Sequence, residues 1–287
     1  MGILTTQKLT EFYDQYRDSE ITYTKDIIRT LKLDPRQVYV KCASGQWPCI
    51  LNSTSYLLAR IIVGTKSGAF TALTEKDANG NVPTINLRLS FFQEDGQLMT
   101  FFISAKVSKM TPYMNSKDLA IATLSFTQRP PDDFIEVTGR LLEANANAIR
   151  RRDERIIINE DSKRKLGLVK EECVVIVQGV PRHCILRDIS FSGAKVILIG
   201  LSQFLSGKEA VVRIEFENPD EIVSIRGNIV SADLIEGRKD ICSASIKFDE
   251  NAVPLAYKLH VNAYLTSVRK AQLSATEQIA QQRNAQV

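Results

Sequence analysis

The spacing of apolar residues divides the chain into two β-rich stretches, each followed by a helix. Apolar residues at helical spacing predict two short helices near the N-terminus, over residues 6–17 and 24–32. Runs rich in β-branched and aromatic residues then predict strands over 37–42, 48–52, 56–63, 85–92, 98–107 and 119–127. The acidic residues after Pro130-Pro131 suit a helix start, and we expect that helix to run over 132–149.

The same order of elements then returns in the second stretch. Strands are predicted over residues 155–159, 172–178, 182–189, 193–199, 209–217, 222–233 and 240–248. A closing helix is expected to begin near Pro254. The last 20 residues are polar and rich in Gln and Ala, so we expect a frayed helix or no helix there.

An internal repeat connects the two stretches. The segment ILNSTSYLLARIIV at 50–63 aligns without gaps with ILRDISFSGAKVIL at 185–198, and Cys49 then falls on Cys184. Further along, the pattern Ala-x-Leu-x-Phe ending at Phe126 resembles the pattern Ala-x-Ile-x-Phe ending at Phe248. We therefore expect two copies of one β-barrel unit.

These patterns predict a mainly β protein built from two tandem antiparallel β-barrels, each with a C-terminal helix, plus short N-terminal helices. A length of 287 residues fits two domains. We assign residues 1–140 to the first barrel domain and 141–155 to the end of a helix and a linker. The second barrel domain covers 150–270, and 271–287 form a polar tail.

Bulk composition excludes several classes of protein. The hydrophobic share of 44% is typical of a protein with a buried core. Residues 1–140 carry 16 basic and 14 acidic side chains and the remainder 21 and 19, so neither half has the charge of a nucleic-acid-binding domain. No apolar run approaches the roughly 18 residues that span a bilayer, and no secretory signal is present, so a cytoplasmic protein is expected.

The cysteines and histidines do not form a metal-binding pattern. The five cysteines are odd in number, include no CxxC pair and lie in apolar, strand-like stretches. The two histidines, His183 and His260, are far apart and have no neighbours at ligand spacing. We therefore expect reduced core thiols and no metal site.

Two short motifs carry the candidate chemistry. The first is RRRDER at 150–155, which contains the element RxxxR, and the second is DISFSG at 188–193, which contains DxSxxG. An arginine fork binds phosphate or the guanine edge in a bidentate manner, and its planar face stacks on a base. A carboxylate accepts hydrogen bonds from guanine N–H groups, a hydroxyl donates or accepts, and glycine permits a tight turn or a close backbone approach.

Arg151 and Arg155 followed by Asp188, Ser190 and Gly193, in this order within a β-rich domain, resemble the PilZ family. The resemblance covers about residues 145–265, and the whole chain resembles members that carry a motif-free barrel ahead of the PilZ barrel. It implies that the bacterial second messenger cyclic di-GMP is the ligand. The two arginines would then clamp phosphate and guanine, and the second motif would shape the base pocket. Arg150 and Arg152 are further candidates, and an arginine at position 150 suggests a stacked pair of ligands.

The first copy of the repeat lacks these groups. Opposite the residues of the second motif stand Ser53, Ser55 and Leu58, and opposite the two motif arginines stand Tyr16 and Glu20. A leucine does not readily take a backbone position that suits glycine, and a glutamate repels phosphate. We therefore expect one nucleotide site per chain, in the second barrel.

The expected mechanism is a switch at the junction between the domains. Ligand phosphates would neutralise the clustered arginines, order the linker and fix one barrel relative to the other. No catalytic motif is present, so we expect neither an enzyme nor a cofactor. The resemblance implies a protein effector, flagellar or regulatory, in motility, adhesion or gene expression. Two alternatives stay open, namely nucleic-acid binding through RRRDER and Lys163-Arg164-Lys165, and a PilZ-fold interaction module without ligand.

Overall fold

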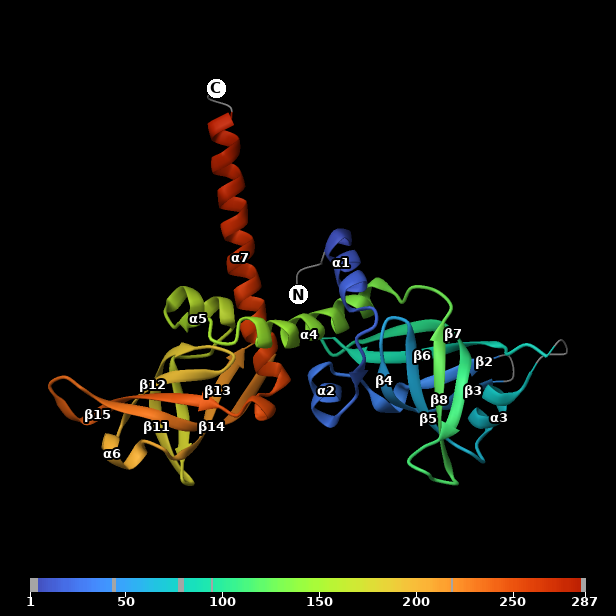
Figure 1. The fold of residues 1–287 in the computed structure, drawn as a ribbon, viewed down its shortest axis with the longest axis horizontal. Coiled ribbons are helices and arrows are strands. Elements are labelled where there is room, and N and C mark those ends of the chain that lie inside the picture. Colours follow the sequence, from blue (N-terminus) through green and yellow to red (C-terminus); the bar gives the residue numbers. More distant parts are fainter. Residues whose placement is uncertain (1–4, 43–44, 77–79, 94, 218, 285–287) are drawn as a thin grey trace. The chain divides into compact units, whose positions relative to one another are not determined.

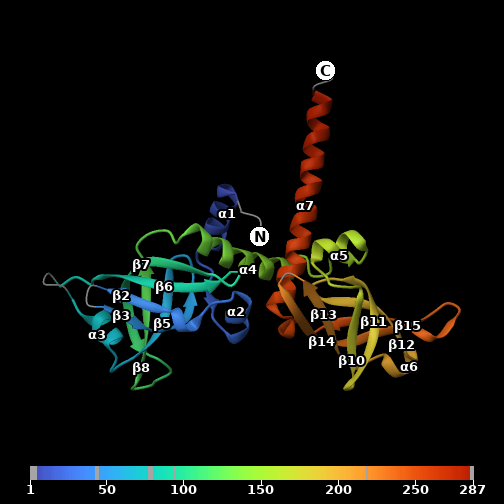
Figure 2. The same ribbon diagram turned by 180° about the vertical axis from the view of Figure 1, so that it is seen from behind.

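The chain forms two compact units, Met1–Leu142 and Glu143–Val287. The computed structural model describes residues 5–42, 45–76, 80–93, 95–217 and 219–284. Each unit is built around antiparallel strands with helices outside them (Figures 1 and 2). The division falls inside helix α4 (Asp132–Arg150), so this single helix contributes residues to both units. The mainly β architecture predicted from the sequence is confirmed.

The first unit contains an eight-stranded antiparallel sheet in the order β1-β4-β5-β8-β7-β6-β2-β3. Strands β3 and β4 are separated by Cys49 alone, so the chain itself joins one end of the ladder back to the other. Its elements before α4 are α1 (Thr6–Tyr16), β1 (Ile21–Thr22), α2 (Lys25–Thr30), η1 (Pro35–Gln37), β2 (Tyr39–Cys42), β3 (Gly45–Pro48), β4 (Ile50–Thr54), β5 (Leu58–Gly64), α3 (Gly68–Thr74), β6 (Thr84–Phe92), β7 (Leu98–Pro112) and β8 (Leu119–Phe126).

The second unit contains seven strands in the order β10-β13-β14-β15-β12-β11-β9, and the pairing of β10 with β11 closes six of them into a barrel. Inward side chains alternate with outward ones along these strands, as a half-buried sheet requires. Its elements after α4 are β9 (Ile156–Ile157), α5 (Glu160–Leu166), β10 (Glu172–Val177), β11 (Val180–Ile189), β12 (Gly193–Ile199), α6 (Ser202–Leu205), β13 (Glu209–Glu217), β14 (Asp220–Ile235), β15 (Arg238–Phe248), η2 (Glu250–Ala252) and α7 (Leu255–Asn284).

The two units are copies of one another in strand register. In the first, Ile21 pairs with Thr54 and Thr22 with Ser53; in the second, the pairs are Ile156 with Ile189 and Ile157 with Asp188. All four positions shift by the same 135 residues, which is the offset of the aligned sequence segments. A register shift also occurs at the same place, between Leu51 and Ser53 and between Leu186 and Asp188. The repeat in the sequence is therefore a repeat of the fold.

Several short elements escaped the sequence patterns. Strand β1 and helices α3, α5 and α6 have at most seven residues each, too few for a periodic signal. Helix α7 reaches Asn284, so the polar tail continues the helix as far as the structure describes it, and 285–287 lie outside the described residues. Among the described residues, no helix combines the length and the hydropathy needed to cross a membrane.

Helices α4 and α7 position the start of the second unit. Asn147 donates a hydrogen bond from Nδ2 to Oδ1 of Asn262 at 2.7 Å, and Asn262 donates in turn to Glu143 at 3.1 Å. Lys258 donates to Asn145 at 3.2 Å. These bonds join the last turns of α4 to the first turns of α7, directly before the arginine-rich segment.

Candidate nucleotide-binding site

The short strand β9 brings the two sequence motifs together. It begins at Ile156, directly after Arg155, and it pairs with the end of β11, where Asp188 lies opposite Ile157. The guanidinium of Arg155 donates a hydrogen bond from Nη1 to Oδ1 of Asp188 at 2.6 Å. The carboxylate of Asp188 is 16% exposed and the arginine 57%, so the acid fixes the position of a cation that still faces solvent.

The second motif continues as a tight turn beyond β11. The backbone N–H of Ser190 donates to the carbonyl of Gly193 at 2.8 Å, and the N–H of Ser192 donates to Oγ of Ser190 at 3.3 Å. The Ser190 side chain is buried, and because its hydroxyl accepts this bond it stabilises the turn. The hydroxyl of Tyr257 in α7 donates to the carbonyl of Ser190 at 2.8 Å. Burial, and then the charge of Asp188, raises the pKa of Tyr257, so the phenol stays a donor.

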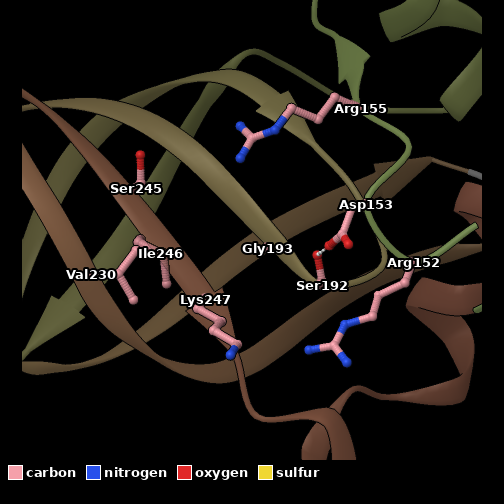
Figure 3. Close-up of a pocket in the computed structure, with 9 residues that line it drawn as sticks. All are labelled: Arg152, Asp153, Arg155, Ser192, Gly193, Val230, Ser245, Ile246 and Lys247. Atoms are coloured by element: carbon pink, nitrogen blue, oxygen red, sulfur yellow. Dashed lines mark hydrogen bonds between the residues drawn. The ribbon is translucent and has the colours of Figure 1, made fainter. Parts of the chain in front are cut away.

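A second set of bonds attaches the arginine-rich segment to this turn. The hydroxyl of Ser192 donates to Oδ1 of Asp153 at 2.7 Å (Figure 3). The N–H of Ser192 also donates to the carbonyl of Arg152, at 3.1 Å. In Figure 3 the guanidinium groups of Arg152 and Arg155 both extend toward the strand that carries Ser245 and Lys247. The two motifs thus form one joined structure on the barrel wall.

Gly193 is required by the packing of the barrel itself. It begins β12 and lies opposite Lys247 of β15. A Cβ atom added at Gly193 would lie 2.4 Å from the carbonyl oxygen of Ile246, which no side chain tolerates without backbone movement. Gly227 of β14 meets the carbonyl of Lys247 in the same way, at 2.3 Å. In this structure, the close backbone approach expected at Gly193 is made by a neighbouring strand.

Three arginines of the first motif each contact a carboxylate. Arg151 lies 3.8 Å from Glu154, Arg152 contacts Glu250 at the start of η2, and Arg155 contacts Asp188. The sequence led us to expect that ligand phosphates neutralise these clustered arginines. In this structure, protein carboxylates already lie against three of them.

The joined motifs border a cleft of about 380 Å³, a volume within the usual range for small-molecule sites. Its lining is mostly polar and carries more positive than negative side chains: Arg152, Asp153, Arg155, Ser192, Gly193, Val230, Ser245, Ile246 and Lys247. A second cleft, of about 450 Å³, shares Val230 and Lys247 with the first and extends to Asp249 and Glu250. The two clefts are therefore neighbours on the barrel surface.

The predicted site residues occupy different places relative to this cleft. Arg155, Arg152 and Gly193 line it, and Asp188 reaches it through its bond to Arg155. Ser190 is buried within the turn. Arg151 is half-buried beside Glu154, and Arg150 is exposed at the end of α4; neither lines the cleft in this structure.

Sequence reasoning missed six residues of the lining, namely Asp153, Ser192, Val230, Ser245, Ile246 and Lys247. The first two lie inside the motifs and could have been chosen by position. Lys247 belongs to β15, and its place becomes visible once the register of β12 against β15 is known.

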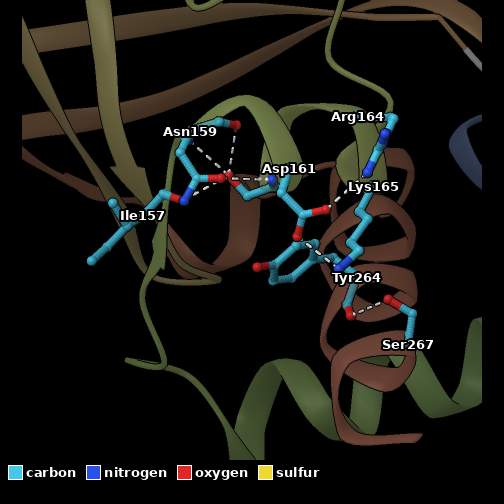
Figure 4. A network of polar contacts seen from close by, with 8 residues as sticks. Ile157, Asn159, Asp161, Arg164, Lys165, Tyr264 and Ser267 are labelled. Atoms are coloured by element: carbon cyan, nitrogen blue, oxygen red, sulfur yellow. Dashed lines mark hydrogen bonds and ion pairs between the residues drawn. The ribbon is translucent and has the colours of Figure 1, made fainter. Parts of the chain in front are cut away.

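The basic run at 163–165 does not form a free cationic surface. Asp161 accepts hydrogen bonds from Arg164 at 3.0 Å and from Lys165 at 2.7 Å (Figure 4), and Glu160 accepts one from Lys163 at 2.8 Å. Bonds to Lys165 and Arg164 lower the pKa of Asp161. Each basic side chain of helix α5 (Glu160–Leu166) is therefore paired with an acid of the first turn of the same helix, and a net charge of +1 remains on the helix.

The first unit presents a different arrangement at the equivalent positions. Glu20 stands where Arg155 stands, and it accepts hydrogen bonds from Ser53 and Arg60. Ser53 takes the place of Asp188, and Arg60 faces Ser53 across the strands as Lys195 faces Asp188. The strand pairing is the same in both units, but the first unit carries Glu20, bonded to Arg60, where the second carries Arg155.

Two family models match the chain, one for each of its two parts. A model described as the PilZN3 domain matches residues 7–145, and one described as the PilZ domain matches residues 149–265. A protein of Treponema denticola named "Cyclic di-GMP binding protein" is 40% identical over 272 residues, covering 94% of this chain and 85% of that protein. The chain therefore belongs to the PilZ family, in the form that carries a PilZN3 domain ahead of the PilZ domain.

Two solved structures of complexes with c-di-GMP are also similar to this chain. The Borreliella burgdorferi PlzA protein in complex with c-di-GMP is 23% identical, with 91% of this chain and 99% of that chain covered and a TM-score of 0.39. YcgR from Escherichia coli in complex with c-di-GMP is 14% identical, with 88% and 92% covered and a TM-score of 0.29.

Proposed function

We propose that the protein is a cyclic di-GMP receptor that binds the nucleotide at the cleft of its C-terminal barrel. The observation that carries the proposal is the junction of the two motifs, in which Asp188 holds Arg155 at 2.6 Å beside a cleft lined by Arg152, Gly193 and Lys247. The 40% identical relative named for cyclic di-GMP binding supports the choice of ligand.

The chemistry of the lining suits this nucleotide. Cyclic di-GMP carries two phosphates and two guanines, and arginine serves both, through bidentate hydrogen bonds and through stacking. We assign phosphate and guanine contacts to Arg155 and Arg151, with Arg152 and Arg150 as further contacts. Arg151 must leave Glu154 to reach the ligand, and their 3.8 Å contact is loose enough to exchange. Asp188 orients Arg155, while Ser190 and Gly193 form the turn under the base.

We further propose that the protein is a receptor and not an enzyme, that it acts in the cytoplasm where the nucleotide is made, and that it signals to a protein effector. Binding is proposed to change the arrangement of the two units, since the first motif directly follows α4, the helix that both units share. Small-angle scattering of the full chain tests this step. We expect the profile to change with nucleotide, and identical profiles would reject it.

The primary test is isothermal titration of the full chain with cyclic di-GMP. Wild type should bind with micromolar or tighter affinity, and the double variant Arg151→Ala/Arg155→Ala should not bind measurably. The matched control is Arg213→Ala/Arg238→Ala, which removes two exposed arginines of β13 and β15 that do not line the cleft. Absence of binding by folded wild type, or equal loss in the control, would reject the receptor assignment.

A further inference from the structure

Two thiols face each other across the seam that closes the second barrel. Cys173 of β10 and Cys184 of β11 are direct partners in the antiparallel ladder. Their sulfur atoms lie 3.1 Å apart, and the two residues are only 6% and 4% exposed. The pairing of β10 with β11 is the one that turns the row of strands into a closed barrel.

The register meets the geometric requirement of a disulfide. Directly opposite residues of antiparallel strands have Cα atoms about 4.5–5.5 Å apart, within the roughly 4.4–6.8 Å that disulfides span. The two sulfurs need to approach by about 1 Å to reach bonding distance. We propose that Cys173 and Cys184 form an oxidative modification site, in which a disulfide crosses and locks the closing seam of the barrel.

A peroxide is the class of oxidant that suits this site, because it is small. One cysteine thiolate attacks a peroxide oxygen, the O–O bond breaks, and a sulfenic acid and hydroxide form. The second thiol then attacks the sulfenic sulfur, the S–O bond breaks, and the S–S bond replaces it. In total, two thiols lose two electrons and two protons, and one molecule of hydrogen peroxide becomes two molecules of water.

The closed seam protects the pair from this reaction. The hydrogen bond between the thiols and their burial raise the pKa of Cys173, so the thiolate forms rarely. Oxidation therefore follows local opening of β10 from β11, and once formed the bond opposes further opening. We expect the product to unfold at a higher temperature than the reduced protein, since a cross-link restricts the unfolded chain.

The first unit supplies an internal comparison. At the same offset, Cys184 corresponds to Cys49 and Cys173 to Val38, and the N–H of Cys49 donates to the carbonyl of Val38 at 3.1 Å. The first unit therefore also brings these two positions together, but only one of them carries a thiol. The variant Cys173→Val therefore copies an arrangement that the fold already accommodates.

The test is peptide mapping of the full chain after hydrogen peroxide. Trypsin cuts after Arg182, between the two cysteines, so a disulfide joins the peptides 171–182 and 183–187. We expect this linked peptide in wild type and in Cys49→Val, its loss after dithiothreitol, and its absence in Cys173→Val. The unfolding temperature should rise on oxidation in the first two proteins and stay unchanged in the third.

Two results would overturn the proposal. One is wild type in which peroxide oxidises cysteines without producing the linked peptide. The other is a linked peptide that joins a different pair of cysteines. Neither result depends on nucleotide binding, and if Cys173→Val fails to fold, the wild-type peptide map still decides between these outcomes.

Discussion

The two barrels share a backbone and differ in the charges placed on it. At one position, β1 and β4 of the first unit bring Glu20 to Ser53, and β9 and β11 of the second bring Arg155 to Asp188. The hairpins β4–β5 and β11–β12 have a register shift at the same place. They also share a turn, in which the N–H of Ser55 or Ser190 donates to the carbonyl of the residue three positions further along the chain. The turn is therefore a property of the barrel, and a few side chains on it distinguish the proposed anion site of the second unit.

The comparison also separates structural residues from proposed binding residues inside one motif. The serine of DxSxxG has the same turn role in both units, so its presence alone does not indicate a ligand. Asp188, Arg155 and Arg151 occur in the second unit alone, at positions where the first carries Ser53, Glu20 and Tyr16. Substitutions that exchange the side chains of the two units at such positions therefore test the comparison.

The largest effect is expected for Gly193→Leu, which introduces the residue of the first copy. Its Cβ would meet the carbonyl of Ile246 at 2.4 Å, so strands β12 and β15 must separate, at a cost of about 1–3 kcal/mol, and nucleotide binding should fall at least about tenfold. Thermal unfolding and titration measure both effects. The reciprocal change Leu58→Gly should leave binding unaltered, and wild-type affinity in Gly193→Leu would contradict the prediction.

Asp188→Ser should weaken binding by about 10- to 100-fold, since Arg155 loses a charge-assisted hydrogen bond worth about 1.5–3 kcal/mol. Titration with cyclic di-GMP measures the change. Asp240→Ser removes an exposed aspartate of β15 that pairs with Arg238, and it should have no effect. Equal affinities of the two variants would mean that Asp188 does not orient the site.

Glu250→Gln should strengthen binding by about two- to fivefold. Glu250 contacts Arg152 with its side chain 59% exposed, and such an exposed pair contributes about 0.2–1 kcal/mol that a ligand phosphate must replace. Glu250 aligns with Gln128 of the first copy, in which no site is expected. Glu236→Gln, at the exposed turn between β14 and β15, is the matched control for net charge, and an equal gain there would remove the specific role.

The smallest effect concerns the acid stability of the first unit. Burial opposes ionisation of Glu20, but the bonds from Ser53 and Arg60 outweigh it and hold the pKa of Glu20 below its usual value. A lowered folded-state pKa contributes stability above the unfolded pKa of about 4.3, and this stability is lost as the pH falls through the folded pKa. Glu20→Gln should therefore lower stability by under about 1 kcal/mol at neutral pH and by less near pH 3.

Urea unfolding at the two pH values measures this difference. Glu75→Gln, an exposed glutamate at the end of α3, is the control and should change stability equally little at both. A loss in Glu20→Gln that is larger at acid pH would contradict the assigned sign.

The sequence predicted the parts of this molecule that repeat regularly or contain a compact motif. Strands alternate in burial, so most were found, and both motifs were found because each is contiguous. The contacts of Lys247 and Glu250 were not predictable, because each depends on strand register across more than 50 residues of chain. Helix α5 could have been found from its capping box, in which Asn159 and Ser162 bond reciprocally, although seven residues give no period.

The bond from Tyr257 to Ser190 connects the turn of the second motif to the base of a long helix. Tyr257 is the third residue of α7, and the helix continues to Asn284 well beyond the barrel (Figure 2). At 1.5 Å per residue, the arm from Tyr257 to Asn284 is about 40 Å long. On an arm of this length, a tilt of about five degrees at the base would displace the far end by about 3–4 Å.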